Sequence, residues 1–218
     1  MRLQVTNSYD DTSSVFALAR RILSGAHKAE AQVPDVDIQS GIGRALRQAS
    51  CVTAAQSLRH KAAHAIGVVE GTLIATDAID GCLCEAQELI SQALATQDTG
   101  ARALIAGRFT DLVNCIDELA NAATFSEINL ISGGKDKIEL ICPIGAQPRH
   151  AIGHIVLMAG ERGLGLKLPR NNFRDNQSIE QAALQLTRAR ARLFKAADTF
   201  LNQASMLAPY LADAAAAA

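Results

Sequence analysis

The sequence has few aromatic residues and no uninterrupted apolar segment long enough to cross a bilayer. Only 4% of the 218 residues are aromatic and none is tryptophan, although 49% are hydrophobic. The apolar mass is therefore alanine, leucine, isoleucine and valine, which favours close helix packing over a large ligand pocket. Because a membrane-spanning helix needs about 20 consecutive apolar residues, we expect no membrane insertion.

The sequence also lacks a block of charge of one sign. Its net charge is −1, so the electrostatic case for nucleic acid or an anionic membrane is missing. The first 16 residues contain no basic segment followed by an apolar core, so we do not expect a cleaved secretory signal. The cysteines are odd in number and fall mostly at helical positions, which predicts small reduced residues rather than a disulfide framework. These are Cys51, Cys82, Cys84, Cys115 and Cys142.

Residues 54 to 94 carry the pattern around which the chain is organised. The positions along one face of this segment are spaced alternately four and three residues apart, which is the pattern of a coiled-coil seam. The seam positions are Ala62, Ile66, Val69, Leu73, Thr76, Asp80, Leu83, Gln87, Ile90 and Leu94. A helix of this length needs long partners to bury its apolar face.

Two further stripes supply those partners. The first comprises Ile105, Phe109, Leu112, Ile116, Leu119 and Ala123. The second comprises Ile179, Ala183, Leu186, Arg190, Leu193, Ala197, Phe200, Ala204 and Leu207. We therefore predict a mainly α protein, an elongated antiparallel helical bundle or coiled-coil rod, with helices over 54–97, 100–124 and 178–208.

The period changes between the second and last helices. INLI (128–131) and KIELIC (137–142) flank the polar SGGKD, which predicts a β-hairpin, and HIVLMA (154–159) predicts a further strand. The predicted domains are a short helix with a linker over 1–37, a helical domain over 38–211 with its β element at about 126–168, and a disordered alanine tail over 212–218. Residues 38–53 are ambiguous because glycines weaken a helix that the apolar spacing supports.

Two histidine pairs have the spacing of a two-ligand metal clip. His60 and His64 are four residues apart, as are His150 and His154. A zinc site needs three or four ligands and neither pair has the HExxH glutamate. We therefore interpret all four as solvent-facing or packed residues.

No other pattern predicts chemistry. Cys82 and Cys84 are two residues apart and point about 200° apart on a helix, so they cannot clasp one ion. The glycines of GLGL (163–166) lack phosphate-loop spacing and predict a turn. We find no nucleophile elbow, paired carboxylates or triad, so we predict no enzyme and assign no catalytic, cofactor-binding or metal residue.

The seams of the long helix and of the last helix each contain one charged residue, and these two, Asp80 and Arg190, are of opposite sign. If the last helix runs antiparallel to the long one with Leu193 opposite Thr76, these two residues face each other. We predict an interhelical ion pair that fixes register more than it adds stability. The alternative is that both side chains extend to water.

The order of these elements, long helix, shorter helix, hairpin and returning helix, resembles the rod domain of bacterial flagellins. The similarity is strongest to alphaproteobacterial-type flagellins and hook-associated proteins, over about residues 40–211. It is carried by TAAQSLRHKA (53–62), ELISQAL (88–94), IDELANAATFSEINLISG (116–133), RGLGL (162–166) and ALQLTRARARLFKAADTFLNQASMLAPYL (183–211).

The resemblance implies a structural subunit of the flagellar filament, exported through the flagellar type III route. Its implied partners are other flagellin or hook-associated subunits and an export chaperone. Its implied location is the bacterial flagellum or the extracellular medium, or the cytoplasm if export fails. The alternative is a cytoplasmic helical interaction or regulatory protein of flagellar assembly.

The sequence departs from the flagellin pattern at three places. Residues 47–49 are Arg-Gln-Ala where the family has Asp-Asn-Pro, and Glu127 stands where the family usually has glycine. If that site needs a positive φ, Glu127 is strained there. The terminal segments, which drive polymerisation in the family, are shorter in this sequence. We therefore expect a co-assembling or accessory subunit rather than a self-polymerising one.

Overall fold

The structure is a computed structural model that describes residues 42–140 and 150–211, with the backbone alone for 42–51. Its elements are α2 (Ile42–Ala95), α3 (Thr99–Ala122), β1 (Ile138–Leu140), β2 (His150–Ile152), the short 3-10 helix η1 (Arg170–Phe173) and α4 (Asn176–Ser205). The protein is thus mainly α with a small antiparallel strand pair, as predicted. The short helix predicted within 1–37 and the tail over 212–218 lie outside the described residues.

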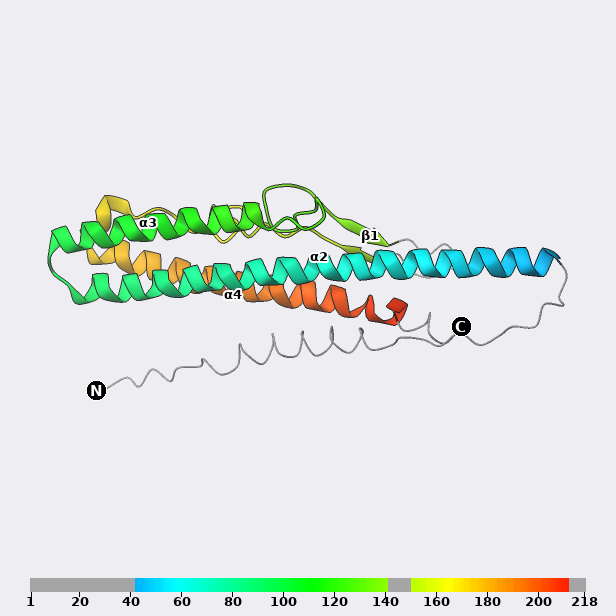
Figure 1. Cartoon of the computed structure of the whole chain (residues 1–218). Coiled ribbons are helices and arrows are strands. Elements are labelled where there is room, and N and C mark those ends of the chain that lie inside the picture. Colours follow the sequence, from blue (N-terminus) through cyan, green and yellow to red (C-terminus); the bar gives the residue numbers. More distant parts are fainter. Residues whose placement is uncertain (1–41, 141–149, 212–218) are drawn as a thin grey trace, which may run out of the picture. The chain divides into compact units, whose positions relative to one another are not determined.

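The chain divides into two compact units, one of which is Ala63–Met206. We refer to it as the bundle unit. Within it, α3 and α4 both run antiparallel to α2 (Figure 1), and α2 contacts α4 through the ion pair of Asp80 and Arg190. Cys82 of α2 contacts Cys115 of α3. The predicted antiparallel return of the last helix is therefore present.

The helix bounds match the prediction at most ends but not at the start of α2. This helix begins at Ile42, so the stretch left ambiguous between 42 and 53 is helical and includes Gly43. A glycine inside a helix costs about 1 kcal/mol relative to alanine. This cost is small enough for a long helix to continue through Gly43. Asp98 caps α3 by accepting hydrogen bonds from Gly100 N at 3.1 Å and Ala101 N at 3.0 Å.

The buried stripe of α2 consists of two rows. The first is the predicted seam, whose buried members are Ala62, Ile66, Val69, Leu73, Thr76, Leu83 and Ile90. The second buried row is Ala65, Thr72, Ile79, Ala86 and Ala93. Each of these lies one residue before a predicted seam position, and Gln87 and Leu94 are exposed instead. A one-residue error rotates a row by about 100° around the helix.

The other two helices also bury a second row, displaced by one residue toward the C-terminus from the predicted positions in α3 and by one residue toward the N-terminus in α4. In α3 the second buried row is Arg102, Ala106, Val113 and Ala120, and in α4 it is Ala182, Ala189 and Ala196. Most of these residues are alanines, which let helix backbones approach closely. The prediction followed larger side chains, whereas packing against two helices at once selects the small ones.

The strands form, but with a different partner from the predicted hairpin. β1 pairs with β2 in the register Ile138↔Ile152, Glu139↔Ala151 and Leu140↔His150. The segment 128–131 is not a strand, because the Asn129 side chain accepts hydrogen bonds from Ile131 N at 3.0 Å and Ser132 N at 2.9 Å. These contacts turn the chain where the hairpin strand was expected to continue.

Residues 154–159 also do not form a regular strand. They lie against 130–131 instead, with Ile155 N donating to Leu130 O and Leu157 N donating to Ile131 O, both at 2.9 Å. The predicted β element therefore occupies the expected region, but its hydrogen bonds join 130–131 to 155–157 and β1 to β2.

Candidate functional site

The four histidines of the two pairs lie in different surroundings. His60 and His64 are exposed on α2. His150 begins β2, whereas the His154 Nε2 atom lies 2.6 Å from the Ser132 carbonyl oxygen. Among the described residues, no three His, Cys, Asp or Glu side chains are grouped to hold a metal ion.

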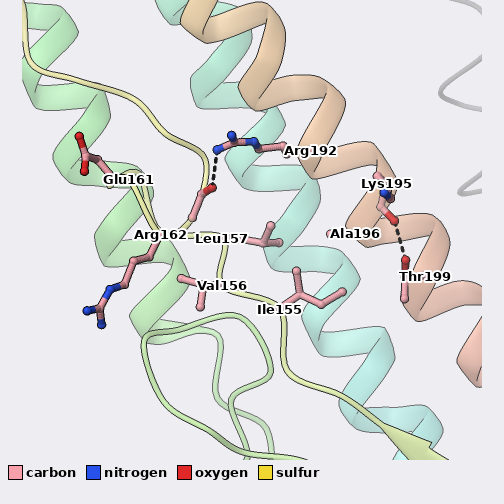
Figure 2. A pocket seen from close by; sticks show the side chains of 10 residues that line it. Ile155, Val156, Leu157, Glu161, Arg162, Arg192, Lys195, Ala196 and Thr199 are labelled. Atoms are coloured by element: carbon pink, nitrogen blue, oxygen red, sulfur yellow. Dashed lines mark hydrogen bonds between the residues drawn. The ribbon is translucent and has the colours of Figure 1, made fainter.

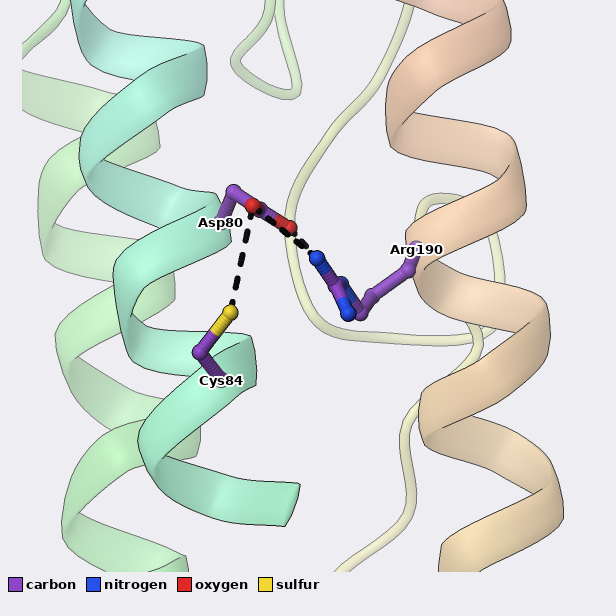
Figure 3. A network of polar contacts seen from close by, with 3 residues as sticks. All are labelled: Asp80, Cys84 and Arg190. Carbon is purple, nitrogen blue, oxygen red and sulfur yellow. Dashed lines mark hydrogen bonds and ion pairs between the residues drawn. The ribbon is translucent and has the colours of Figure 1, made fainter. Parts of the chain in front are cut away.

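The predicted ion pair between α2 and α4 is confirmed. Arg190 Nε donates to Asp80 Oδ1 at 2.9 Å and Arg190 Nη2 donates to Asp80 Oδ2 at 3.2 Å, so the pair is bidentate. The Asp80 carboxylate also accepts a hydrogen bond from the Cys84 thiol, with 3.9 Å between sulfur and oxygen (Figure 3). The Arg190 guanidinium lies 5.5 Å from the centre of the Phe194 ring.

The pair lies beside the buried rows rather than within them. Ile79 and Ala189, the preceding residues, are fully buried, whereas the Asp80 and Arg190 side chains keep 20% and 28% of their exposure. Flanking positions of this kind carry register-setting charges in coiled coils. Partial exposure reduces the desolvation penalty that a fully buried pair would meet.

A buried arginine that the sequence analysis missed fixes the other end of the bundle unit. Arg102 on α3 is only 4% exposed. Its Nε donates to Thr96 O at 2.9 Å, Nη1 to Arg174 O at 3.2 Å and Nη2 to Asn176 Oδ1 at 2.7 Å. One side chain therefore joins the α2–α3 loop to the start of α4. Its only sequence signal was a heptad spacing from Phe109.

The GLGL segment forms a turn, as predicted, and the structure shows why its glycines are needed. A Cβ on Gly163 would lie 2.0 Å from the Met158 carbonyl oxygen, and Gly165 has φ +78°. The turn is closed by Leu164 N donating to Met158 O at 2.8 Å. Arg192 of α4 donates to Gly163 O at 3.0 Å, so this arginine holds the turn against α4.

A cavity of about 440 Å³ lies between the 155–163 segment and α4. Figure 2 shows Ile155 and Leu157 facing α4, whereas Val156, Glu161 and Arg162 point away from it. Glu161 is paired with Lys167 at 3.0 Å, and this hydrogen bond and charge hold the pKa of the Glu161 carboxyl below its usual value. The lining of the cavity combines apolar side chains with the charged side chains of Glu161, Arg162, Arg192 and Lys195.

The polar contacts of Asp80, Arg102 and Arg192 hold helices and a turn in register within the bundle unit. Cys82 and Cys84 diverge as expected, one toward α3 and the other toward Asp80. The arrangement is suited to presenting helix surfaces in a fixed geometry.

Within the described residues, none of the helices is both long enough and apolar enough to cross a membrane. Neither the comparison with protein-family models nor the search of curated proteins found a match for this chain.

Proposed function

We propose that this chain is a flagellin-type structural subunit that co-assembles with other flagellin or hook-associated subunits. It reaches the filament through the flagellar type III route with the help of an export chaperone. Its function is to present helical surfaces to neighbouring subunits in a fixed register. This proposal carries no catalytic step, cofactor or metal.

The observation that carries the proposal is the backbone at Glu127. The flagellin resemblance puts a glycine at this position, and glycine sites of that kind need a positive φ. Ser126 and Glu127 have φ values of 50° and 68°, and Phe125 pairs with Ile128 across them. The chain thus keeps a glycine-type turn although the residue is glutamate, which supports descent from a sequence with glycine there.

The RGLGL segment supports the same conclusion. It carries part of the resemblance, and both of its glycines are sterically required, Gly163 by the Met158 carbonyl and Gly165 by its positive φ. Asp117 of α3 accepts a hydrogen bond from Ala159 N at 2.7 Å, which fixes this turn to the second helix. The two glycines that carry this part of the resemblance are therefore residues that the local structure requires.

Exposed apolar side chains on the helices supply contact points for neighbouring subunits. Leu104 on α3 is 75% exposed, Ile74 on α2 is 68% exposed and Leu184 on α4 is 51% exposed. Scattered exposed apolar residues are common on monomers, so a substitution at Leu104 provides the test of this role.

Sedimentation tests the proposal directly. The purified full chain is centrifuged alone and with a full-length flagellin from the same cell under polymerising conditions. We expect it to remain in the supernatant alone and to pellet with the filaments. The variant Leu104→Gln should pellet less, whereas Asn114→Gln, at an exposed polar position of the same helix, should pellet as the parent does.

Export provides the second test. Secretion into the medium that is lost when the flagellar export apparatus is deleted supports the subunit. Retention in the cytoplasm, together with no pelleting, would overturn the proposal in favour of a cytoplasmic regulator of assembly. Long filaments formed by the chain alone would contradict co-assembly.

A further inference from the structure

Two cysteines from different helices face each other in the bundle unit. Cys82 on α2 donates its S–H to the sulfur of Cys115 on α3, with 3.8 Å between the two sulfur atoms. Both are free thiols and both are partly exposed. Cys84, only two residues from Cys82, turns instead toward Asp80. Helical geometry therefore selects one cysteine of α2 to face α3.

The thiol pair is reachable from solvent. Cys115 lines a groove of about 670 Å³ between α2 and α3. The charged side chains of this groove are Glu85, Glu88, Arg108 and Asp111. A small reagent that enters the groove therefore meets the sulfur of Cys115.

We propose that Cys82 and Cys115 are an oxidisable dithiol that forms an interhelical disulfide by exchange with a low-molecular-weight disulfide. The Cys115 thiolate attacks one sulfur of the reagent, which forms a mixed disulfide and releases the first reagent thiolate. The Cys82 thiolate then attacks the Cys115 sulfur and releases the second. Two protein thiols are oxidised, one reagent disulfide is reduced to two thiols, and both protein protons pass to the released thiolates or to solvent.

The surroundings of Cys82 set the order of these steps. Burial, the hydrogen bond with Cys115 and the negative charge of Glu85 raise the pKa of the Cys82 thiol to about 11. Little thiolate is present there at neutral pH, so Cys82 suits the second, intramolecular step, in which proximity compensates for low ionisation. Closure should accelerate as pH rises toward that pKa. The other charges facing the groove are those of Glu88, Arg108 and Asp111.

The disulfide would link α2 covalently to α3. It closes a loop between residues 33 positions apart in sequence, which contains the end of α2, the Asp98 cap and most of α3. Cross-linking restricts the unfolded chain, so the oxidised protein should unfold at a higher temperature than the reduced one. The oxidised form therefore holds these two helices together against separation.

Two full-length variants with matched cysteine pairs test the inference. The first keeps Cys82 and Cys115 and carries Cys51→Ser, Cys84→Ala and Cys142→Ser. The second keeps Cys84 and Cys115 and carries Cys82→Ala in place of Cys84→Ala. Each is treated with oxidised glutathione, natively and in denaturant, and the disulfides are counted by mass spectrometry after alkylation of free thiols. Far-UV circular dichroism checks that both are folded.

We expect the native 82–115 pair to close at least about tenfold more often than the native 84–115 pair, because the first pair is preorganised. In denaturant the two variants should close to a similar extent. Equal closure in the native state, or an 82–115 yield no higher natively than in denaturant, would overturn the inference. Closure is independent of filament assembly, so its failure leaves the proposed function untouched.

Discussion

Removing one member of the Asp80–Arg190 pair should destabilise the bundle unit by an amount that its partial burial sets. An exposed ion pair contributes about 0.2–1 kcal/mol, and breaking a fully buried one costs about 3–5 kcal/mol. With the two side chains 20% and 28% exposed, we expect a loss between these limits, about 2 kcal/mol for Asp80→Ala. Arg190→Ala should cost somewhat more, because it also removes the contact with Phe194, worth about 0.5–1 kcal/mol.

A double-mutant cycle isolates the pair itself. Urea unfolding of the parent, both single variants and the double variant, followed by far-UV circular dichroism, should give a coupling free energy of about 1–2 kcal/mol. Asp77→Ala serves as the matched control, because Asp77 lies one turn away on the exposed face of α2 and should change stability by less than about 0.5 kcal/mol.

A double substitution and the size of the coupling free energy give two further outcomes. Replacing both charges with leucine should leave stability unchanged or slightly higher, since an apolar pair avoids desolvation. A coupling below about 0.3 kcal/mol would refute the reasoning, because that value belongs to a solvated surface pair. An Asp77→Ala loss as large as that of Asp80→Ala would refute it as well.

Four further outcomes follow from single sites. Glu127→Gly should raise the free energy of unfolding by about 0.5–1 kcal/mol, because it relieves a residue at φ 68°; an unchanged or lower urea midpoint contradicts this. Gly163→Ala should lower the free energy of unfolding by about 3 kcal/mol, because its Cβ would lie 2.0 Å from the Met158 carbonyl oxygen. The control Gly160→Ala, whose Cβ meets no atom within 4 Å, should lower it by less than about 1 kcal/mol. Arg102→Met should cost about 3 kcal/mol in thermal or urea unfolding, since three acceptors lose a buried charged donor. The pKa of Cys82 is higher in the folded protein, about 11, than its ordinary value of 9.0, so folding favours the protonated thiol. Stability should therefore fall as pH rises through this range, and the fall should be smaller in Cys82→Ala.

The fold class was readable from the sequence because helix periodicity is a local property. Three stripes with steps of four and three predicted three helices, and the structure contains all three near the predicted bounds, except that α2 begins earlier, at Ile42. An antiparallel return of the last helix, with Leu193 opposite Thr76, predicted a contact between Asp80 and Arg190, and the structure contains that contact. The strain expected at Glu127 is present as a positive φ.

The exact packing rows were not readable because they depend on which helices are neighbours. Ala86 and Ala93 carry little apolar signal, yet both are buried, whereas Leu94 is 45% exposed. Close approach of α2 to two other helices rewards small side chains at positions where a size-weighted pattern ignores them. Arg102 was missed for a related reason, because a charged residue is buried only when distant carbonyls are brought within its reach.

The strand pairing was predicted wrongly because of a single side chain. Asn129 takes the N–H groups of Ile131 and Ser132, so INLI turns instead of pairing with β1. Alternation and a polar loop predict that a hairpin can form, but they contain no information about a competing side-chain acceptor.

The sequence by itself determined the mainly α class, the order of the helices, the turn at GLGL and the ion pair between α2 and α4. Each of these follows from spacing along one element or from a unique pair of opposite charges. Only the tertiary structure decided which alanine rows are buried, that Arg102 links α3 to the start of α4, that β1 pairs with β2, and that Cys82 rather than Cys84 faces Cys115. Those features depend on the rotation of one helix against another, which long-range packing fixes and local periodicity does not.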